Sequence, residues 1–193
     1  MTAPTTWNLA DLFESVVDVI GDRPSVSVPN AHDGPREFTL AELDERANRL
    51  AHALAERGVG VGDKVAVYGY NSNEWLEAQW AAWKLRAVPV NVNYRYVEGE
   101  LTYLLDNSDS VAVVHGAEFS PRLANIRKDL PGLKACIAWA DGSGEDISAC
   151  GAEDYEAVLA ASSPERGFGE RSNDDVYMLY TGGTTGMPKG VMW

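Results

Sequence analysis

Residues 64–92 read KVAVYGYNSNEWLEAQWAAWKLRAVPVNV, and their pattern decides the fold. Residues 65–68 and 88–92 are short apolar runs bounded by polar or turn residues, which is typical of buried strands. Ser72 is a preferred residue at a helix start, and residues 74–85 after it are long enough for about three turns. A strand, a helix and a second strand in this order predict a crossover connection, which makes the two strands parallel.

The same alternation continues on both sides of this unit. Toward the N-terminus the pattern predicts a helix at 9–20, a hairpin of strands at 25–28 and 37–39, and a helix at 40–54. Toward the C-terminus it predicts a helix at 97–106, a strand at 111–115, a helix at 118–130 and a strand at 135–138. Strands that alternate with helices of this length predict an α/β fold, with a mainly parallel sheet covered by helices on both faces.

The predicted helix at 40–54 has the clearest start. Thr39 and Glu42 form a capping box, in which each side chain binds the backbone N–H of the other residue. Apolar residues recur at helical spacing along one side, and Gly58 follows as a stop signal. Asp44 and Glu45 lie on this helix, and we expect both carboxylates to be solvated.

Residues 140–171 interrupt the alternation. They are rich in glycine, serine, aspartate and glutamate, and only residues 155–160 have a helical pattern. This composition is typical of loops. We therefore expect a surface excursion at 140–171, after which residues 176–190 supply a last strand and a loop.

The net charge of the 193-residue chain is −13, which limits its partners. A chain this acidic lacks the basic footprint that a nucleic-acid backbone requires, so nucleic acid is excluded as its main partner. A nucleotide needs only a local positive site and is compatible with this charge. No apolar run approaches the ~18 residues of a membrane span, and the acidic first thirty residues do not predict a signal peptide.

Cys136 and Cys150 are the only cysteines in the chain. Their number and spacing predict neither a disulfide framework nor a zinc site, and they fit a reduced, cytoplasmic protein. His32, His52 and His115 also show no ligand spacing. We therefore expect no catalytic or metal-binding role for the histidines.

Residues 176–190, VYMLYTGGTTGMPKG, carry the most specific chemistry of the chain. Five mostly apolar residues predict a buried strand at 176–180, and a loop rich in glycine and threonine follows. Glycines let successive backbone N–H groups converge on an anion, hydroxyls add donors, and a lysine adds a mobile positive charge. We therefore expect phosphate groups to bind at Thr181, Gly182, Gly183, Thr184, Thr185, Gly186 and Lys189.

This loop is not a Walker A motif, because Pro188 and Gly190 replace that motif's second glycine and its serine or threonine. It resembles the signature T-[SG]-G-[ST]-T-G-x-P-K-G of the adenylate-forming superfamily, which includes acyl-CoA synthetases, firefly luciferase and peptide-synthetase adenylation domains. Residues 181–190 match this signature at every position. Residues 38–51, 62–66 and 91–101 are also similar to the opening domain of these enzymes. Residues 91–101 and 190–193 most resemble bacterial fatty-acyl-CoA and sterol-side-chain acyl-CoA synthetases.

The resemblance implies a place in a larger enzyme. Residues 1–193 would be the N-terminal portion of the large AMP-binding domain, without the small C-terminal domain that carries the catalytic lysine. The parent would activate a fatty or related carboxylic acid with ATP to an acyl adenylate and then transfer it to CoA. ATP, Mg²⁺ and CoA are the implied small-molecule partners, with Thr184 as a candidate contact to Mg-ATP. No catalytic residue is expected in these 193 residues, so the isolated chain should be inactive.

Two other interpretations remain open at this point. The parent could be an acyl-AMP ligase or a peptide-synthetase-type adenylation domain, which passes the acyl group to a carrier protein. A truncated, non-catalytic interaction module belongs to a different class altogether. Coding residues beyond Trp193 would distinguish these readings, and neither the acyl substrate nor the oligomeric state follows from the resemblance.

Overall fold

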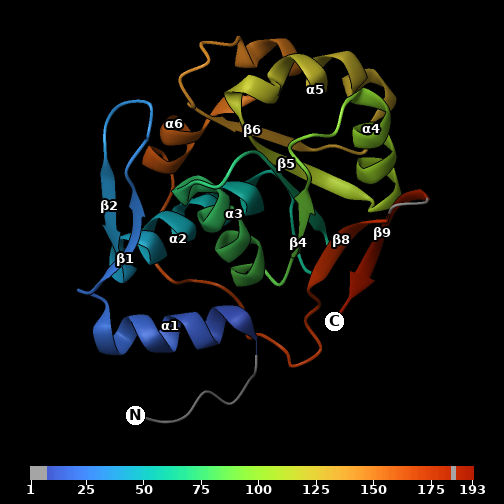
Figure 1. Ribbon diagram of the computed structural model, residues 1–193. Coiled ribbons are helices and arrows are strands. Elements are labelled where there is room, and N and C mark those ends of the chain that lie inside the picture. Colours follow the sequence, from blue (N-terminus) through green and yellow to red (C-terminus); the bar gives the residue numbers. More distant parts are fainter. Residues whose placement is uncertain (1–7, 184–185) are drawn as a thin grey trace.

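The computed structural model describes residues 8–183 and 186–193 (Figure 1). Its main feature is a seven-stranded sheet with the strand order β7-β6-β5-β3-β4-β8-β9. All neighbouring strands are parallel except β8 and β9, which confirms the expected mainly parallel sheet. The strands of this sheet are β3 (Lys64–Tyr68), β4 (Val88–Val92), β5 (Ser110–Gly116), β6 (Ala135–Trp139), β7 (Glu153–Asp154), β8 (Met178–Gly183) and β9 (Gly186–Met192).

Strand β3 lies inside the sheet because the strand order reverses there. The chain places β4 on one side of β3 and then returns to place β5 on the other side. Val67 of β3 accordingly pairs with Asn91 of β4 and with Val114 of β5. Such a reversal creates a switch point, where parallel α/β proteins bind ligands beyond the carboxyl ends of the strands.

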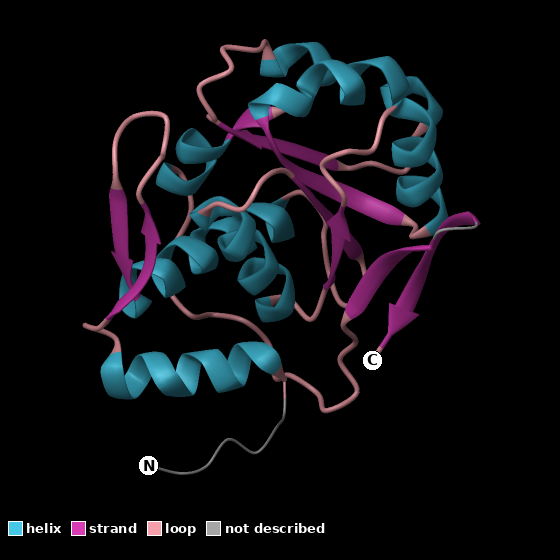
Figure 2. Cartoon of the chain, in the orientation of Figure 1, coloured by secondary structure: helices cyan, strands magenta, loops and turns pink. Residues whose placement is uncertain are grey.

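Helices cover both faces of the sheet, as expected (Figure 2). Val65 and Val67 belong to the core formed with α2, α3 and α6. Ala66 and Tyr68 belong to the core formed with α4 and α5, because successive side chains of a strand point to opposite faces. The helices are α1 (Leu9–Ile20), α2 (Leu40–Glu56), α3 (Asn73–Lys84), α4 (Glu98–Asn107), α5 (Ser120–Ile126) and α6 (Tyr155–Ala160).

The N-terminal elements pack against α2 and α3. Strands β1 (Pro24–Val28) and β2 (Arg36–Thr39) form the expected antiparallel hairpin. Helix α1 places Phe13 in a stack against Trp80 of α3, with ring centroids 4.2 Å apart. The capping box of α2 is also present, since Thr39 and Glu42 bind each other's backbone N–H groups.

A buried ion network joins α1, α2 and α3. The fully buried Lys84 ammonium donates to Glu14 Oε1 at 2.5 Å and to Asp44 Oδ1 at 2.6 Å. Arg166 Nε donates to the other Asp44 oxygen at 2.8 Å. The expectation that Asp44 is solvated is therefore wrong, because two cations neutralise its carboxylate in the interior. Glu45, by contrast, is exposed as expected.

The single helix expected at 118–130 is divided. It consists of the 3-10 turns η1 (Ala117–Phe119) and η2 (Arg127–Asp129) on either side of α5. Pro121 occupies the first turn of α5, where its fixed φ and missing N–H suit a helix start. At the other end Arg127 donates to the carbonyls of Leu130 and Leu133 at 2.9 Å, so these carbonyls are bound outside a helix.

Residues 140–171 lie closer to the core than their composition predicts. The 3-10 turn η3 (Ile147–Cys150) packs on α5, and β7 extends the sheet beside β6. Tyr155 at the start of α6 is completely buried and donates to the buried Glu77 carboxylate at 2.6 Å. Most of this stretch is exposed, but its few apolar residues cover the sheet, while its polar residues form the turns.

Candidate functional site

Strands β8 and β9 form an antiparallel hairpin next to β4 (Figure 1). Thr181 lies opposite Lys189, and Gly183 lies opposite Gly186. The strand expected at 176–180 thus corresponds to β8, which begins at Met178. Most of the loop expected after it belongs instead to β8 and β9. Of the seven residues expected to bind phosphate, Thr181, Gly182, Gly183, Gly186 and Lys189 lie in this hairpin, whereas Thr184 and Thr185 lie outside the described residues.

The end of the hairpin projects beyond the neighbouring strand. Strand β8 runs parallel to β4, with Met178 opposite Val90. Strand β4 ends at Val92, so residues from Thr181 onward continue past its carboxyl end. This is the edge of a parallel sheet at which α/β proteins bind their ligands.

Lys189 supplies an available positive charge at this edge. Its side chain is exposed, and no ion pair or hydrogen bond joins it to any described residue. Thr181, its partner across the hairpin, is also exposed. An ammonium without a partner beside a hydroxyl and glycine-rich backbone can bind an anionic oxygen without first breaking an internal contact.

Asn91 holds the hairpin to the sheet. Its Oδ1 accepts a hydrogen bond from Tyr180 N at 2.9 Å, and its Nδ2 donates to Tyr180 O at 3.3 Å. The Tyr180 hydroxyl donates to Asn107 Oδ1 at 2.9 Å. Burial, with smaller contributions from Tyr103 and Asp109, raises the pKa of Tyr180, which keeps this phenol protonated as a donor.

Gly190 allows the Tyr180 ring to lie across β9. A Cβ at position 190 would lie 3.0 and 3.1 Å from two carbons of that ring and 3.3 Å from Met178 Sδ. These separations are shorter than ordinary van der Waals contacts. The glycine is therefore required here for close packing rather than for an unusual φ.

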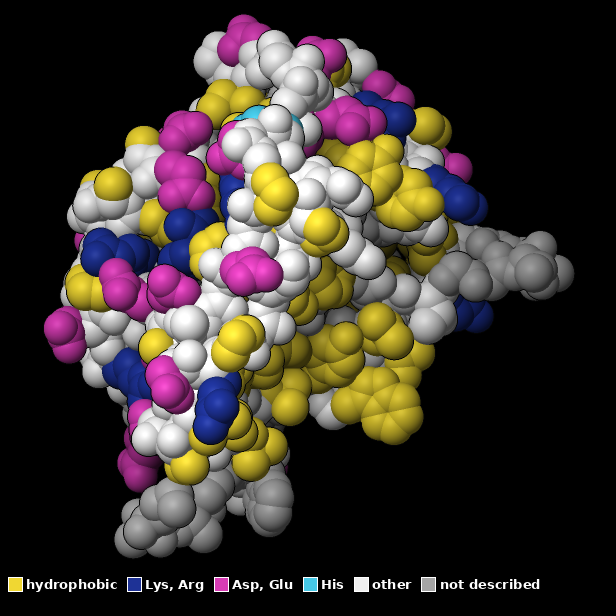
Figure 3. All heavy atoms as spheres, turned by 60° about the vertical axis from the view of Figure 1, so that its left-hand side comes forward, with side chains coloured by type: hydrophobic (Ala, Val, Ile, Leu, Met, Phe, Trp, Pro, Cys, Tyr) yellow, Lys and Arg dark blue, Asp and Glu magenta, His cyan; other side chains and the backbone are white. Residues whose placement is uncertain are grey.

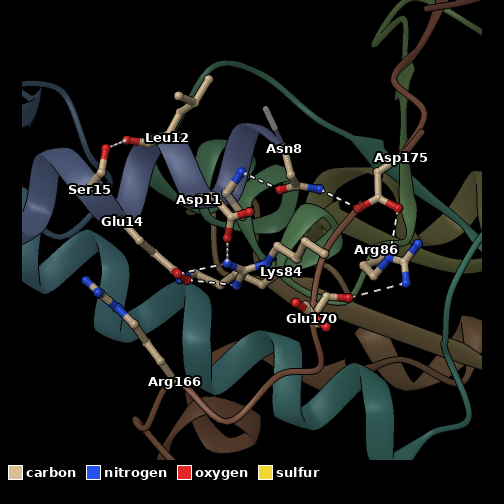
Figure 4. Close-up of polar contacts among 12 residues, drawn as sticks. Asn8, Asp11, Leu12, Glu14, Ser15, Lys84, Arg86, Arg166, Glu170 and Asp175 are labelled. Carbon is tan, nitrogen blue, oxygen red and sulfur yellow. Dashed lines mark hydrogen bonds and ion pairs between the residues drawn. The ribbon is translucent and has the colours of Figure 1, made fainter. Parts of the chain in front are cut away.

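Asp175 fixes the segment that leads into β8. One carboxylate oxygen accepts from Arg86 Nε at 2.8 Å, and the other accepts from Asn8 Nδ2 at 2.7 Å (Figure 4). Arg86 lies in the turn between α3 and β4 with a left-handed φ of 58°. The segment is thereby tied both to the start of α1 and to the turn that precedes β4.

A cavity at the switch point is a second candidate region. It has a volume of about 170 Å³, and its lining includes Arg36, Tyr70, Glu74 and Gly116. Arg36 donates to Glu74 at 2.8 Å, so the main opposite charges of the cavity already neutralise each other. The hairpin is the stronger candidate for an anion because the Lys189 charge has no such partner among residues 8–183 and 186–193.

Several contacts have no signal in the sequence. The roles of Asn91 and Asp175 depend on residues about 90 positions away along the chain. His115, Cys136 and Cys150 have no ligand spacing, yet their ligand atoms all lie within 4.8 Å of one another in the core. Only the packing of β5, β6 and η3 brings these three residues together.

The parallel sheet, covered on both faces and extended by a glycine- and threonine-rich hairpin, defines an α/β fold of the nucleotide-binding class. A family model described as AMP-binding enzyme matches residues 13–193, and the chain belongs to this family. Among the described residues, no helix is both long and apolar enough to cross a membrane.

Curated relatives with high identity are CoA ligases. The chain is 53% identical over 186 residues to the 3-oxocholest-4-en-26-oate–CoA ligase of Rhodococcus rhodochrous, and the match covers 96% of this chain and 33% of that protein. It is 48% identical over 190 residues to the medium/long-chain-fatty-acid–CoA/3-oxocholest-4-en-26-oate–CoA ligase of Mycobacterium marinum, with 96% and 34% covered. The chain therefore spans about a third of the length of these relatives.

Solved structures show the same fold. The anthranilate CoA ligase AuaEII, in complex with anthranoyl-AMP, matches with a TM-score of 0.86 at 26% identity, over 98% of this chain and 35% of that chain. The N-terminal domain of FACL13 from Mycobacterium tuberculosis matches with a TM-score of 0.82 at 29% identity, over 96% and 44%. The sheet and its helices therefore correspond to the N-terminal region of adenylate-forming enzymes.

Proposed function

We propose that this chain is the N-terminal portion of the AMP-binding domain of an acid:CoA ligase. The full-length parent would activate a fatty acid or a sterol side-chain acid as an acyl adenylate and transfer the acyl group to CoA. The observation that carries the proposal is the hairpin, in which Thr181, Gly182 and Lys189 of the signature lie past the carboxyl end of β4. The names of the related CoA ligases favour CoA over a carrier protein as acceptor.

In this proposal the hairpin binds the β- and γ-phosphates of ATP while the substrate carboxylate attacks the α-phosphorus. Negative charge then accumulates on the departing pyrophosphate. Backbone N–H groups, the Thr181 hydroxyl and the exposed Lys189 ammonium would stabilise that charge at fixed positions. Thr184 is the candidate contact to the Mg²⁺ that accompanies ATP, and when bound this ion neutralises part of the phosphate charge.

We further propose that these 193 residues do not turn over alone, since a third of the relatives' length would supply one wall of the active site. The expected compartment is the cytoplasm, where ATP and CoA are available and the free thiols of Cys136 and Cys150 stay reduced. Calorimetry of this chain with ATP should detect only weak binding. Micromolar affinity would contradict the proposal that this chain supplies only one wall of the active site.

The test of the function uses the full-length parent in an ATP–pyrophosphate exchange assay with fatty acids and with 3-oxocholestenoate. Exchange that depends on the acid, followed by formation of an acyl-CoA thioester when CoA is added, is the expected result. Exchange without any thioester would indicate an acyl-AMP ligase instead. Absence of exchange with every acid would contradict the proposed function.

A further inference from the structure

Three potential metal ligands from separate elements meet beneath the turn η3. His115 lies near the end of β5, Cys136 lies in β6, and Cys150 ends η3. Cys136 Sγ lies 3.4 Å and Cys150 Sγ 3.8 Å from the same atom, His115 Nε2. All three residues are buried, with exposed fractions of 0%, 6% and 1%.

The imidazole is oriented so that Nε2 can bind a cation. His115 Nδ1 lies 2.9 Å from Gly116 O. A carbonyl oxygen can only accept a hydrogen bond, so Nδ1 carries the proton and Nε2 presents its lone pair to the two sulfur atoms. A backbone carbonyl that fixes the tautomer in this way is the usual support of a metal-binding histidine.

The dimensions of the cluster match a tetrahedral zinc ion. Zn–S bonds of about 2.3 Å and Zn–N bonds of about 2.0–2.1 Å place a nitrogen and a sulfur ligand about 3.5 Å apart, and two sulfur ligands about 3.8 Å apart. The observed separations of His115 Nε2 from the two sulfurs are 3.4 and 3.8 Å, and all the ligand atoms lie within 4.8 Å. Shifts of less than an ångström would therefore complete three of the four bonds.

Charge also favours a divalent ion at this position. Two thiolates and a neutral imidazole carry a total charge of −2, which one Zn²⁺ ion cancels. A neutral complex avoids the cost of placing a net charge in the apolar core that contains both cysteines. The two thiol protons would pass to solvent when the ion binds, so charge and atoms balance.

A buried hydroxyl is a candidate for the fourth ligand. Ser120 begins α5, the helix against which η3 packs. Its side chain is fully buried, and its hydroxyl oxygen has no hydrogen-bond partner among the described residues. This hydroxyl, or a water molecule bound to the ion, would complete the coordination.

We propose that His115, Cys136 and Cys150 bind one Zn²⁺ ion, which links β5, β6 and η3. Without the ion, the Cys150 thiol donates to Ile147 O at 3.2 Å and the Cys136 thiol lies against His115 Nε2. The metal-free chain is thus expected to fold. The ion then adds stability by fixing η3, which carries Cys150, against the sheet.

Cobalt(II) tests this site directly, because it occupies zinc sites and its absorption spectrum reports thiolate ligands and tetrahedral geometry. We expect one Co²⁺ per chain, with a sulfur-to-cobalt charge-transfer band and visible tetrahedral bands that added Zn²⁺ abolishes. We also expect Zn²⁺ to raise the melting temperature of the chain. A folded, reduced chain that shows no charge-transfer band would overturn the proposal, whatever the behaviour of any variant.

Variants assign the ligands. Cys150→Ser and His115→Gln should each remove the charge-transfer band or reduce its intensity, and both should abolish the Zn²⁺-dependent rise in melting temperature. His52→Gln is the matched control, because His52 contacts Glu165 O outside the cluster and should leave the spectrum unchanged. An unchanged spectrum in folded Cys150→Ser would place the ion elsewhere and contradict the assignment.

Discussion

At the scale of single residues, the candidate site depends on two contacts that position the hairpin. Asn91 uses its side-chain amide to pair with the backbone of Tyr180, where the regular β4–β8 pairing consists of Val90 and Met178 alone. Gly190 leaves space for the Tyr180 ring on the facing strand. The hairpin is thus held through Tyr180, one residue before the expected phosphate-binding residues begin.

Gly190→Ala should destabilise the chain, because the added methyl group would overlap with the Tyr180 ring. We expect the free energy of unfolding to fall by about 1–3 kcal/mol, the usual cost of overpacking. Urea denaturation measures this change. Gly60→Ala is the control, since a Cβ there would meet nothing within 4 Å; equal losses in the two variants would refute the packing argument.

Asn91→Ala should weaken the attachment of the hairpin. It removes both hydrogen bonds to the Tyr180 backbone, which together should contribute about 1–3 kcal/mol to the free energy of unfolding. Hydrogen exchange of the Tyr180 amide should accelerate for the same reason. The exposed Asn30 provides a control as Asn30→Ala, and unchanged exchange at Tyr180 in Asn91→Ala would count against this role.

At the scale of elements, helix α1 is secured mainly by ion pairs with buried partners. Glu14 accepts from the buried Lys84 and also from Arg171 at 2.8 and 2.9 Å. Although burial by itself raises it, these hydrogen bonds hold the pKa of Glu14 below its ordinary value of 4.5. The ionised carboxylate therefore stabilises the folded state above pH 4.5, and this stabilisation is lost as the pH falls through the lower folded pKa.

Glu14→Gln should accordingly have a pH-dependent effect. At pH 7 we expect the free energy of unfolding to fall by about 1.5–3 kcal/mol, the range for hydrogen bonds to a charged group. As the pH falls through the lowered pKa of Glu14, the wild-type carboxyl becomes protonated, so the two proteins should converge in stability. Urea denaturation over a pH series tests this, with the exposed Glu56→Gln as control. A difference in the free energy of unfolding that stays constant at all pH values would show that protonation of Glu14 is not coupled to stability.

Elements with strong local signals were predictable from the sequence. The capping box at Thr39 and Glu42, and the strand–helix–strand pattern of residues 64–92, appear in the structure within a residue or two of their expected positions. The short helix at 155–160 was also predictable from its pattern, but the burial of Tyr155 was not, because it depends on Glu77 in a distant helix. Asp44 likewise has the sequence pattern of a surface residue, and only the tertiary contact with Lys84 reveals its burial.

The candidate site was predictable to the extent that it is a local motif. Thr181, the three glycines and Lys189 follow one another closely enough for composition and signature to identify them. Asn91, which supports them, is 89 residues from Tyr180, and no spacing rule connects the two. The same limit applies to the cluster of His115, Cys136 and Cys150, whose members meet only through the order of the strands.

At the scale of the whole molecule, hydrophobic side chains gather on one face, as the space-filling view shows (Figure 3). Strand β9 is the last strand in the sheet order and carries exposed apolar residues at its end, including Met192 (68% exposed) and Trp193 (79% exposed). An apolar edge strand can pair with other chains through its free backbone groups. We therefore expect the isolated chain to self-associate through β9.

Met192→Lys should reduce this association, because a charge on an edge strand opposes pairing with another copy. Sedimentation velocity over a range of concentrations should show a smaller associated fraction than for the wild type. Val61→Lys changes an equally apolar and 66% exposed residue outside the strands, so it should have no effect. A wild-type chain that stays monomeric at high concentration would contradict the prediction.

The central claim, that the hairpin binds the phosphates of ATP, is tested most directly by Lys189→Ala in the full-length ligase, measured by acid-dependent ATP–pyrophosphate exchange. The Lys189 side chain makes no hydrogen bond or ion pair with a described residue, so the variant should keep its melting temperature while exchange falls on the order of 100-fold, as for loss of one transition-state donor. The exposed Lys128→Ala should exchange like the wild type. Unchanged exchange in Lys189→Ala would contradict the claim.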